Sequence, residues 1–490
     1  MTAHLHPRRD DRSGFAAALF SAIFPGLGHV YLGHRTRALA WAVLPFLAVA
    51  LLAGVAVRPA VRMEALAQLT SPSWLLAALG LNVLLLLYRS LAVFDAYRLA
   101  RPEPVPDRRN RAQHTLSLLG LAAVVVGLSL AHLAIGRLNL AVYQAVTGLN
   151  SGDQAPVDPG TPPDGGLVTL APEPIPSPSG TDPVASAPPT QMPLPSPTAG
   201  SPWDGEERLN ILLIGADHRP GVGGYLTDTM IVASIDPRSR QVAMFSLPRD
   251  TSNVPLPPDW PAARRYANGV YPNKINSLYT IARQAPSAFP GDDAQRGFVA
   301  LKGALGQLYG IDIKYHVTVD FEGFLDVLEA IGGATIDVQV PVRDVHYPAD
   351  DGRGSLNLYI PPGVQHFDGR EALAYARARH ATSDFDRAER QQRVITSIAR
   401  QTDLSTLLAP GRIEALFQAV RKTLRTDIPP ELFPELIRLG QGVDLDAVRS
   451  IVFTPPEHMR VCFPCEPSGQ YVLLPNVEAI RRTVREAFEP

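Results

Sequence analysis

The sequence predicts an α/β sandwich domain that follows an N-terminal, all-α membrane region. Residues 1–150 contain three long apolar stretches, the second of which holds Arg89 and Asp95 towards its end, and about 20 apolar residues suffice for a helix to cross a bilayer. Residues 206–490 alternate short apolar runs with helical patterns, as expected when strands and helices form stacked layers. Residues 151–205 are dominated by Pro, Ser, Gly and Thr. This composition predicts a disordered linker between the two parts, since it offers little apolar surface to bury.

The membrane region is expected to hold about three transmembrane helices. They are predicted at Ala38–Val57, Trp74–Tyr97 and Thr115–Gly136. A fourth apolar stretch, Phe15–Leu32, is broken by Pro25 and two glycines, so it is expected either to span or to lie as an interfacial hairpin. Arg89, inside the second stretch, is expected to extend its charge toward the membrane interface.

Arginines predict the orientation of these helices. The N-terminal tail and the residues next to it carry five arginines up to position 37, residues 98–111 carry five more, and residues 58–73 carry two. Because short cytoplasmic segments carry the excess of Lys and Arg, the tail and the 98–111 loop are predicted to be cytoplasmic. Three spans then place the 206–490 domain on the extracytoplasmic side of the cytoplasmic membrane.

Three short apolar runs begin the soluble domain and predict a set of strands. They are Leu209–Gly215, Thr229–Ile235 and Gln241–Leu247. The last two are joined by DPRS, a turn sequence, and form a predicted hairpin. Asp228 before the first hairpin strand and Arg249 after the second must therefore share one sheet edge. Asp217 arrives at the same edge if its strand runs antiparallel to its neighbour.

Two carboxylates and an arginine at one sheet edge suggest a metal and phosphate site. Mg²⁺ is commonly held by one or two carboxylates together with phosphate oxygens and waters. Asp217 and Asp228 are the candidate ligands, and Arg249 would hold the rest of an oligophosphate. The alternative is that each aspartate only forms a turn, which is a frequent role of Asp at strand ends.

Helices and strands continue to alternate after the hairpin. Helices are predicted at Lys274–Arg283, Ala294–Tyr309 and Phe321–Ile331, and strands at Ile313–Asp320, Ala334–Val340 and Tyr471–Leu474. The sequence contains no P-loop, GxGxxG, HExxH or GxSxG motif. The net charge of −2 gives no signature of nucleic-acid binding.

The segment 369–393 concentrates arginines in a helix-loop-helix pattern. Its arginines are Arg370, Arg377, Arg379, Arg387, Arg390 and Arg393. Asp386 is predicted to cap the second helix in a capping box with Glu389. Arg387 would then lie in the first turn, where the helix dipole already favours an anion. Guanidinium groups gathered there suit a phosphate or diphosphate, whereas the alternative is a solvated basic face paired with acidic residues.

The two cysteines of the chain are Cys462 and Cys465. A local disulfide is the first expectation, because the predicted compartment is oxidising. A redox motif or half of a zinc site are the alternatives.

With these blocks in place, the soluble domain resembles the LytR-CpsA-Psr family from about Arg208 to Arg400. The resemblance rests on seven blocks in order: NILLIGADHR, LTDTMIVASIDP, VAMFSLPRDT, NKINSLYTIA, VDFEGFLDVLEAIGGATIDV, FDGREALAYARARH and SDFDRAERQQRV. It implies a three-layer α-β-α sandwich with a mixed sheet and an apolar tunnel for a lipid. It also implies a membrane-anchored, Mg²⁺-dependent (or Mn²⁺-dependent) phosphotransferase that moves a glycopolymer from a polyprenyl-diphosphate carrier to a peptidoglycan hydroxyl.

The resemblance also assigns roles to residues. Asp217 and Asp228 match the metal ligands. The residues that match the diphosphate-binding group, or lie in a matching block, are Arg249, Lys274, Arg377, Arg379, Arg387 and Gln391. Many members have arginine two residues before the second aspartate, where this chain has Leu226, so Arg219 is a candidate replacement for that phosphate contact.

The implied reaction is attack of the acceptor hydroxyl on the sugar-linked phosphorus, with release of polyprenyl phosphate. Asp228, Arg249, Arg377 and Arg379 are the candidate catalytic residues, and either Asp228 or Asp250 is the candidate base. The alternatives are a polyprenyl-diphosphate hydrolase and a non-catalytic lipid or glycan sensor.

Overall fold

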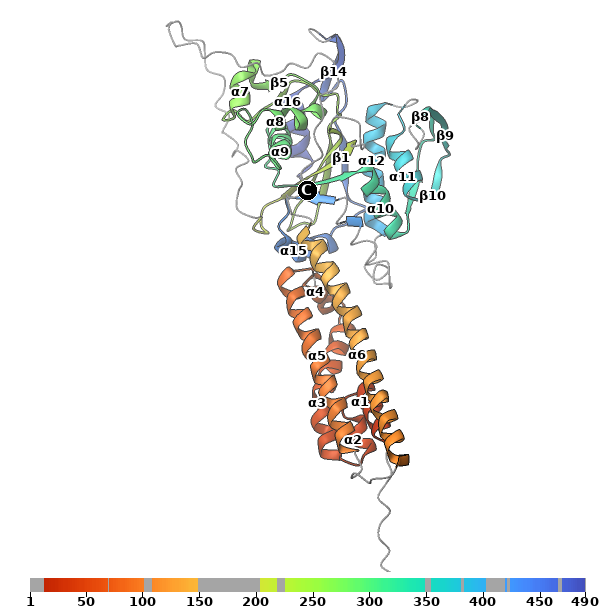
Figure 1. Ribbon diagram of the computed structural model, residues 1–490. Coiled ribbons are helices and arrows are strands. Elements are labelled where there is room, and N and C mark those ends of the chain that lie inside the picture. The colour runs from red at the N-terminus through yellow and green to blue at the C-terminus, as the bar shows by residue number, and fades with distance from the viewer. Residues whose placement is uncertain are drawn as a thin grey trace, which may run out of the picture. The chain divides into compact units, whose positions relative to one another are not determined.

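A computed structural model describes residues 13–68, 70–100, 108–148, 203–217, 225–348, 354–379, 383–401, 419–420, 424–465 and 469–489. The chain divides into two compact units, Met1–Val146 and Thr147–Pro490 (Figure 1). Each unit is described on its own below.

The first unit is entirely helical in its described residues. Its helices are α1 (Gly14–Ile23), α2 (Leu27–Tyr31), α3 (Arg35–Val57), α4 (Pro59–Gln68), α5 (Pro72–Leu99) and α6 (Arg108–Gly148). Within the described residues, three helical segments are long and apolar enough to cross a membrane: Arg35–Val57, Pro72–Leu99 and Thr115–Gly148. They contain the three predicted stretches.

The fourth apolar stretch forms a pair of short helices, α1 and α2. The chain turns at Gly26, whose φ of 103° is one that glycine adopts at little energetic cost. Ala18 of α1 packs against Val93 and Tyr97 of α5. Nη2 of Arg89 donates to the carbonyl of Ala22 and so satisfies one of the free carbonyls at the end of α1. The expected extension of Arg89 toward the membrane interface stays a prediction.

The second unit is built on a six-stranded sheet in the order β11-β6-β1-β2-β3-β12. The strands are β1 (Leu209–Asp217), β2 (Leu226–Ile235), β3 (Val242–Ser246), β6 (Tyr315–Asp320), β11 (Leu424–Thr426) and β12 (Arg449–Val452). β1 is parallel to β6 and β3 to β12, whereas β2 is antiparallel to both β1 and β3. The sheet is therefore mixed, as the family resemblance implies.

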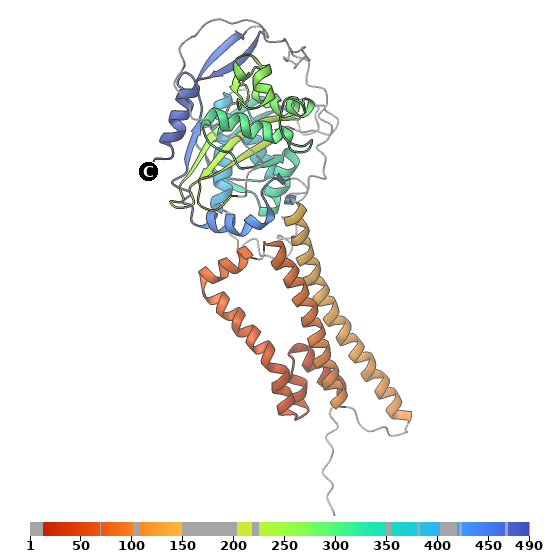
Figure 2. The ribbon, with the colours of Figure 1, turned by 90° about the vertical axis from the view of Figure 1, so that its left-hand side faces the viewer.

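Helices cover both faces of this sheet and make a three-layer α-β-α sandwich (Figures 1 and 2). On one face lie α8 (Leu278–Gln284), α9 (Arg296–Tyr309) and α16 (Val477–Glu486). On the other lie α10 (Phe321–Ile331), α11 (Gly369–Arg377) and α12 (Asp384–Gln401). The larger core fills the first interface, where Leu212, Val232 and Phe245 of the sheet pack with Leu301 and Ile480 of the helices.

Local sequence explains where the central helices begin and end. α9 ends at Gly310 and α10 at Gly332, and both glycines adopt the left-handed conformation at the helix end. α10 starts at the cap Asp320, whose side chain accepts a hydrogen bond from the N–H of Gly323. The predicted helix Phe321–Ile331 has the bounds that the structure shows.

Smaller elements surround the sandwich. The remaining strand pairs are β4 (Val254–Pro255) with β5 (Val270–Tyr271), β7 (Ala334–Val338) with β10 (Gly363–Phe367), β8 (Val342–Pro348) with β9 (Ser355–Ile360), and β13 (Met459–Cys465) with β14 (Gln470–Pro475). The remaining helices described are α7 (Pro261–Arg265), η1 (Ala267–Gly269), η2 (Ile275–Ser277), η3 (Pro430–Leu432) and α15 (Phe433–Gln441).

Both ends of the described second unit are anchored by burial. Trp203 is buried and its N–H donates to the hydroxyl of Tyr315 at 2.9 Å, so the folded part begins slightly before residue 206. At the other end, Cys462 and Cys465 form the expected local disulfide in the β13–β14 hairpin. Leu473 of β14 and Ile480 of α16 are fully buried in the main core.

Candidate functional site

The site lies at the sheet edge where β1 ends and β2 begins. Asp217, the last residue of β1, pairs through its backbone with Leu226, the first residue of β2. Gly215 pairs with Thr229 but Ala216 pairs with Thr227, so the register shifts by one residue. Asp228 is the extra residue of this β-bulge. Bulges turn a side chain away from the regular alternation of a strand.

The bulge depends on a close approach at Gly215. A Cβ atom built on this glycine would lie 2.9 Å from both Cβ and Oγ1 of Thr229. These atoms are close to the backbone and cannot move away easily. The small residue that ends the LNILLIG run therefore has a steric role beside Asp228.

Asp228 and Arg249 form the ion pair that the hairpin argument predicts. Nη1 of Arg249 lies 2.8 Å from Oδ2 of Asp228. Nδ2 of Asn276 donates to the other carboxylate oxygen at 3.4 Å. The structure thus confirms that Asp228 and Arg249 share one sheet edge, although Asp228 lies inside β2 rather than before it.

A second carboxylate at the site, Asp384, was not identified from the sequence. Oδ1 of Asp384 lies 3.1 Å from Nη1 of Arg387 and 3.9 Å from Nε of Arg249. Nη2 of Arg387 also donates to the backbone carbonyl of Asp228 at 3.0 Å. The available signal was its spacing, because Asp384 precedes Arg387 by three residues and such pairs share a helix face.

The helix that carries Arg387 is capped differently from the prediction. The Ser383 hydroxyl accepts from the N–H of Asp386 at 3.1 Å, and the Asp386 carboxylate accepts from the N–H of Ser383 at 2.8 Å. The capping box is therefore Ser383–Asp386, and the predicted Asp386–Glu389 box is wrong by one turn. The local sequence SDFD offers three side-chain acceptors, and the helix begins after the first of them, Ser383. Arg387 still lies in the first turn.

Burial and charge both act on this cluster. Burial raises the pKa of the Asp384 carboxyl, although the nearby Arg387 and Arg249 oppose that shift. Burial lowers the pKa of Arg387, with Asp384 acting in the opposite direction. Burial also disfavours the charge of Arg249, but Asp228 and Asp384 outweigh it and raise its pKa. The two arginines and two aspartates of the cluster therefore interact in a largely buried environment, where charges are weakly screened.

Two guanidinium N–H groups at the site have no hydrogen-bond partner within the described residues. Nε of Arg249 and Nε of Arg387 are buried and make no hydrogen bond within the described part of the chain. Leaving a buried donor unsatisfied costs about 1–3 kcal/mol. An anionic ligand that accepts from both groups would recover this energy, as oxygens of a phosphate can.

A neighbouring ion pair extends the cluster. Nζ of Lys274 lies 2.5 Å from Oδ1 of Asp250, in the loop that follows Arg249. The hydroxyl group of Tyr471 on β14 also belongs to this region: burial raises its pKa, and the charges of Asp250 and Asp384 raise it further. The N–H of Leu473 donates to the carbonyl of Asp250 at 3.0 Å, so the C-terminal hairpin supports the loop directly.

The other predicted arginines lie around the end of α11. The guanidinium of Arg377 stacks 4.0 Å above the ring of Phe321, at the start of α10. The side chain of Arg379 is exposed, and its backbone N–H donates to the buried carboxylate of Asp344 at 3.0 Å. Gln391 of α12 is half-buried, and its Nε2 donates to the carbonyl of Ala376 at 3.4 Å. The charge of Arg379 contributes to the lowered pKa of Arg387, so these two cations lie near each other.

Two arginines of the basic segment have structural contacts instead. Arg390 is buried and its Nε donates to the carbonyl of Tyr375 at 2.8 Å. Arg393 donates to the hydroxyl of Tyr375 at 2.9 Å. Both contacts hold α12 against α11, so the basic segment is divided between packing and the site.

Two predicted site residues fall outside what the structure describes. These are Arg219 and the side chain of Asp217; the backbone of Asp217 ends β1 as stated above. Within the described residues, no group of three or more His, Cys, Asp or Glu side chains is placed to hold a metal. Mg²⁺ bound with phosphates needs only one or two carboxylates, but both carboxylate oxygens of Asp228 are engaged here, by Arg249 and Asn276. The predicted metal pair therefore stays a prediction.

Comparison with known proteins extends this picture. The sequence profile of the LytR_cpsA_psr family matches residues 185–460, which is more than half of the chain. The transferase TagV of Bacillus subtilis (strain 168), named a polyisoprenyl-teichoic acid–peptidoglycan teichoic acid transferase, is 27% identical over 274 residues, or 54% of this chain and 60% of that protein. TagU of Halalkalibacterium halodurans, with the same activity in its name, is 27% identical over 226 residues, or 46% of this chain and 62% of TagU.

A solved structure is also similar. The crystal structure of B. subtilis TagV matches with a TM-score of 0.43 and 25% identity, covering 58% of this chain and 99% of that one. The chain thus spans less than two thirds of the length of the curated relatives named here. Because the family profile covers more than half of the chain, the chain belongs to the LytR_cpsA_psr family.

Proposed function

We propose that this protein transfers a glycopolymer from a polyprenyl-diphosphate carrier to a hydroxyl group of peptidoglycan. The observation that carries the proposal is the pair of buried guanidinium N–H groups on Arg249 and Arg387 beside Asp228, neither of which makes a hydrogen bond within the described residues. Such a pair fits the diphosphate of a lipid carrier. The names of the relatives TagV and TagU, which are teichoic acid transferases acting with polyisoprenyl carriers, support the choice of reaction.

In the proposed reaction, the acceptor oxygen attacks the phosphorus that bears the glycan. A new phosphorus–oxygen bond forms, the bond to the bridging diphosphate oxygen breaks, and polyprenyl phosphate leaves. The hydroxyl proton passes to a carboxylate, for which Asp228 and Asp250 are the candidates. Arg249, Arg377, Arg379 and Arg387 stabilise the charge that moves to the leaving phosphate.

Arg387 and Lys274 are held in positions that would orient the carrier for this reaction. Arg387 is fixed by Asp384 and by the carbonyl of Asp228, so its remaining N–H has a defined direction. Lys274 is held by Asp250 next to the same loop. Asp217 and Asp228 would hold Mg²⁺ (or Mn²⁺), which when bound would neutralise part of the diphosphate charge.

The proposed location follows from the helical unit. The spans of the first unit would anchor the protein in the cytoplasmic membrane, with its arginine-bearing ends in the cytoplasm. The second unit would then act on the extracytoplasmic side, where peptidoglycan is found.

The decisive experiment uses the purified full chain in lipid nanodiscs. It is incubated with a short-chain prenyl-diphosphate sugar, a soluble peptidoglycan fragment and Mg²⁺, and the products are identified by mass spectrometry. We expect a glycan-phosphate–peptidoglycan adduct that disappears when a chelator is added. An adduct that persists with chelator would refute the metal assignment but not the transfer.

Other products would replace the proposal. Prenyl phosphate without an adduct, even when the peptidoglycan fragment and the prenyl chain are varied, would indicate a hydrolase that uses water as the acceptor. Bound but uncleaved carrier would indicate a lipid or glycan sensor.

A further inference from the structure

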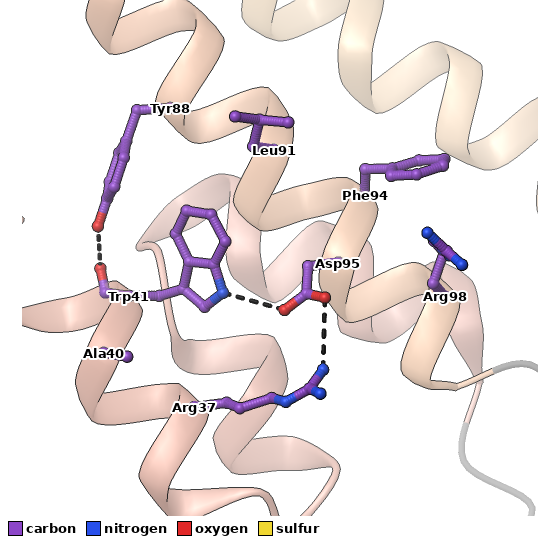
Figure 3. Close-up of a pocket in the computed structure, with 8 residues that line it drawn as sticks. All are labelled: Arg37, Ala40, Trp41, Tyr88, Leu91, Phe94, Asp95 and Arg98. Atoms are coloured by element: carbon purple, nitrogen blue, oxygen red, sulfur yellow. Dashed lines mark hydrogen bonds and ion pairs between the residues drawn. The ribbon is translucent and has the colours of Figure 1, made fainter.

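The helical unit contains a pocket that the proposed reaction does not use. It has a volume of about 730 Å³ and lies between α3 and α5 (Figure 3). Its walls combine the apolar side chains of Trp41, Leu91 and Phe94 with the charged side chains of Arg37, Asp95 and Arg98. A concave site with both kinds of surface suits a ligand with an apolar body and a charged head.

The pocket lies at the arginine-bearing ends of the two spans. Arg37 belongs to the first turn of α3 and Arg98 to the last turn of α5, and the two helices run antiparallel here, since Arg37 contacts Asp95 while Trp41 contacts Tyr88. Leu91 and Phe94 are at least half exposed on the pocket wall. The charged rim is therefore placed where a span meets lipid headgroups, and the apolar wall faces the acyl region.

The acidic group of the pocket is already occupied by donors. Oδ2 of Asp95 accepts from Nε1 of Trp41 at 3.0 Å and lies 2.9 Å from Nε2 of the buried His29. Its other oxygen lies 3.5 Å from Nη1 of Arg37. Asp95 is thus held by these contacts and in turn positions Arg37 and Trp41, as the dashed contacts in Figure 3 show.

Arg37 and Arg98 both retain guanidinium N–H groups that can donate to a ligand. The side chain of Arg37 is 55% exposed and touches Asp95 through one long contact. Arg98 is exposed and lies 5.7 Å from the Phe94 ring, and in the parts of the chain described no carboxylate pairs with it. With two arginines against one aspartate, the pocket has an excess of positive charge at headgroup depth.

We propose that this pocket binds an anionic phospholipid, with its phosphate between Arg37 and Arg98 and an acyl chain along Leu91 and Phe94. Basic pockets between transmembrane helices bind anionic headgroups in this way, and each nearby arginine contributes about 1 kcal/mol, or about fivefold in affinity. A zwitterionic lipid gains less, because its ammonium group would meet the same arginines. The pocket uses none of the candidate site residues of the second unit, such as Asp228, Arg249 and Arg387, and its proposed ligand does not depend on the proposed reaction.

The test uses native mass spectrometry of the full chain released from mixed micelles that contain equal amounts of phosphatidylglycerol and phosphatidylcholine. We expect phosphatidylglycerol adducts on the wild-type chain and about fivefold fewer on Arg98→Gln. The matched control is Arg35→Gln, because Arg35 is an exposed arginine at the start of α3 that does not line the pocket. It should keep the adducts, and circular dichroism checks that each variant stays helical.

A second measurement locates the lipid. Phosphatidylglycerol brominated on its acyl chains should quench the fluorescence of Trp41, obtained as the difference between the wild type and Trp41→Phe, and Arg98→Gln should weaken that quenching. Equal losses in Arg35→Gln and Arg98→Gln, or equal binding of both lipids, would overturn the proposal in favour of general surface attraction. Displacement by millimolar inorganic phosphate would show that the pocket recognises phosphate alone and not a lipid.

Discussion

Arg249 and Arg387 show how single residues prepare the candidate site to bind an anion. Each guanidinium is fixed on one side by a carboxylate, and its buried Nε makes no hydrogen bond in the described residues. This arrangement is poor for the isolated fold and good for an arriving anion, because the donors are desolvated and aimed in advance.

Replacing Arg387 by alanine should therefore abolish most of the transfer. We expect a loss of about a hundredfold or more in rate, the usual effect of removing one charge-stabilising donor. The product assay described above measures it, and thermal melting confirms folding. Arg400→Ala is the matched control, since Arg400 lies on the same helix but pairs with the exposed Asp446. Near-normal transfer by Arg387→Ala would contradict the site assignment.

Gly215 offers a test of the bulge itself. Gly215→Ala brings a Cβ to 2.9 Å from Thr229, so the backbone must shift beside Asp228. We expect up to about a hundredfold slower transfer, because small misplacements of reacting groups are costly. Gly440→Ala in α15 is the control: open space surrounds that position, and the change should leave transfer intact while stabilising the fold by about 0.4–1 kcal/mol. Full activity of Gly215→Ala would show that the bulge geometry is dispensable.

At the scale of secondary-structure elements, a buried network holds β11 to β6. Asp427, which follows β11, accepts from the backbone N–H of His316 at 2.7 Å and pairs with the ammonium group of Lys302. Burial acts to raise the pKa of Asp427, but His316 and Lys302 outweigh it and hold that pKa well below the usual range. The carboxylate therefore stabilises the fold in its charged form.

The pH dependence of stability follows from that lowered pKa. The unfolded chain binds the proton more readily than the folded chain, so the contribution of Asp427 is complete above about pH 5 and declines as the pH falls below about 4. Asp427→Asn should destabilise the protein by about 3 kcal/mol at neutral pH. Thermal melts should show this difference narrowing in acid. The exposed Asp446→Asn should show almost none, and a constant difference at all pH values would exclude the charge as its cause.

The elements also show what could be predicted from the sequence. The hairpin argument located Asp228 and Arg249 together because antiparallel strands bring their neighbouring ends to one edge. Asp384 was missed because SDFD contains three possible cap acceptors, and only the packed helix shows that Ser383 caps it while Asp384 pairs with Arg387. The sequence could not show that Arg390 has a packing role while Arg387 belongs to the site, because both are arginines. The role of Arg390 depends on which carbonyls of α11 it contacts.

At the scale of the whole molecule, the helical unit predicts a testable orientation. Thr36 lies at the arginine-bearing end of α3, and Ser355 begins β9 in the second unit. With cysteine at either position, a membrane-impermeant maleimide should label Ser355→Cys in intact cells and Thr36→Cys only after permeabilisation. The native cysteines are joined in a disulfide and serve as the unlabelled background. Labelling of Thr36→Cys in intact cells would reverse the proposed topology.

The C-terminal strand β14 and helix α16 limit where a recombinant fragment of this domain can end. The family profile ends at residue 460, yet Leu473 and Ile480 beyond it are core residues. Leu473 also exchanges backbone hydrogen bonds with Asp250 and Ser252, next to the ion pair of Lys274. A recombinant fragment cut at residue 460 would therefore lose core residues and the backbone contacts that support the loop after Arg249, so the end of the family profile is not a suitable end for a folded fragment.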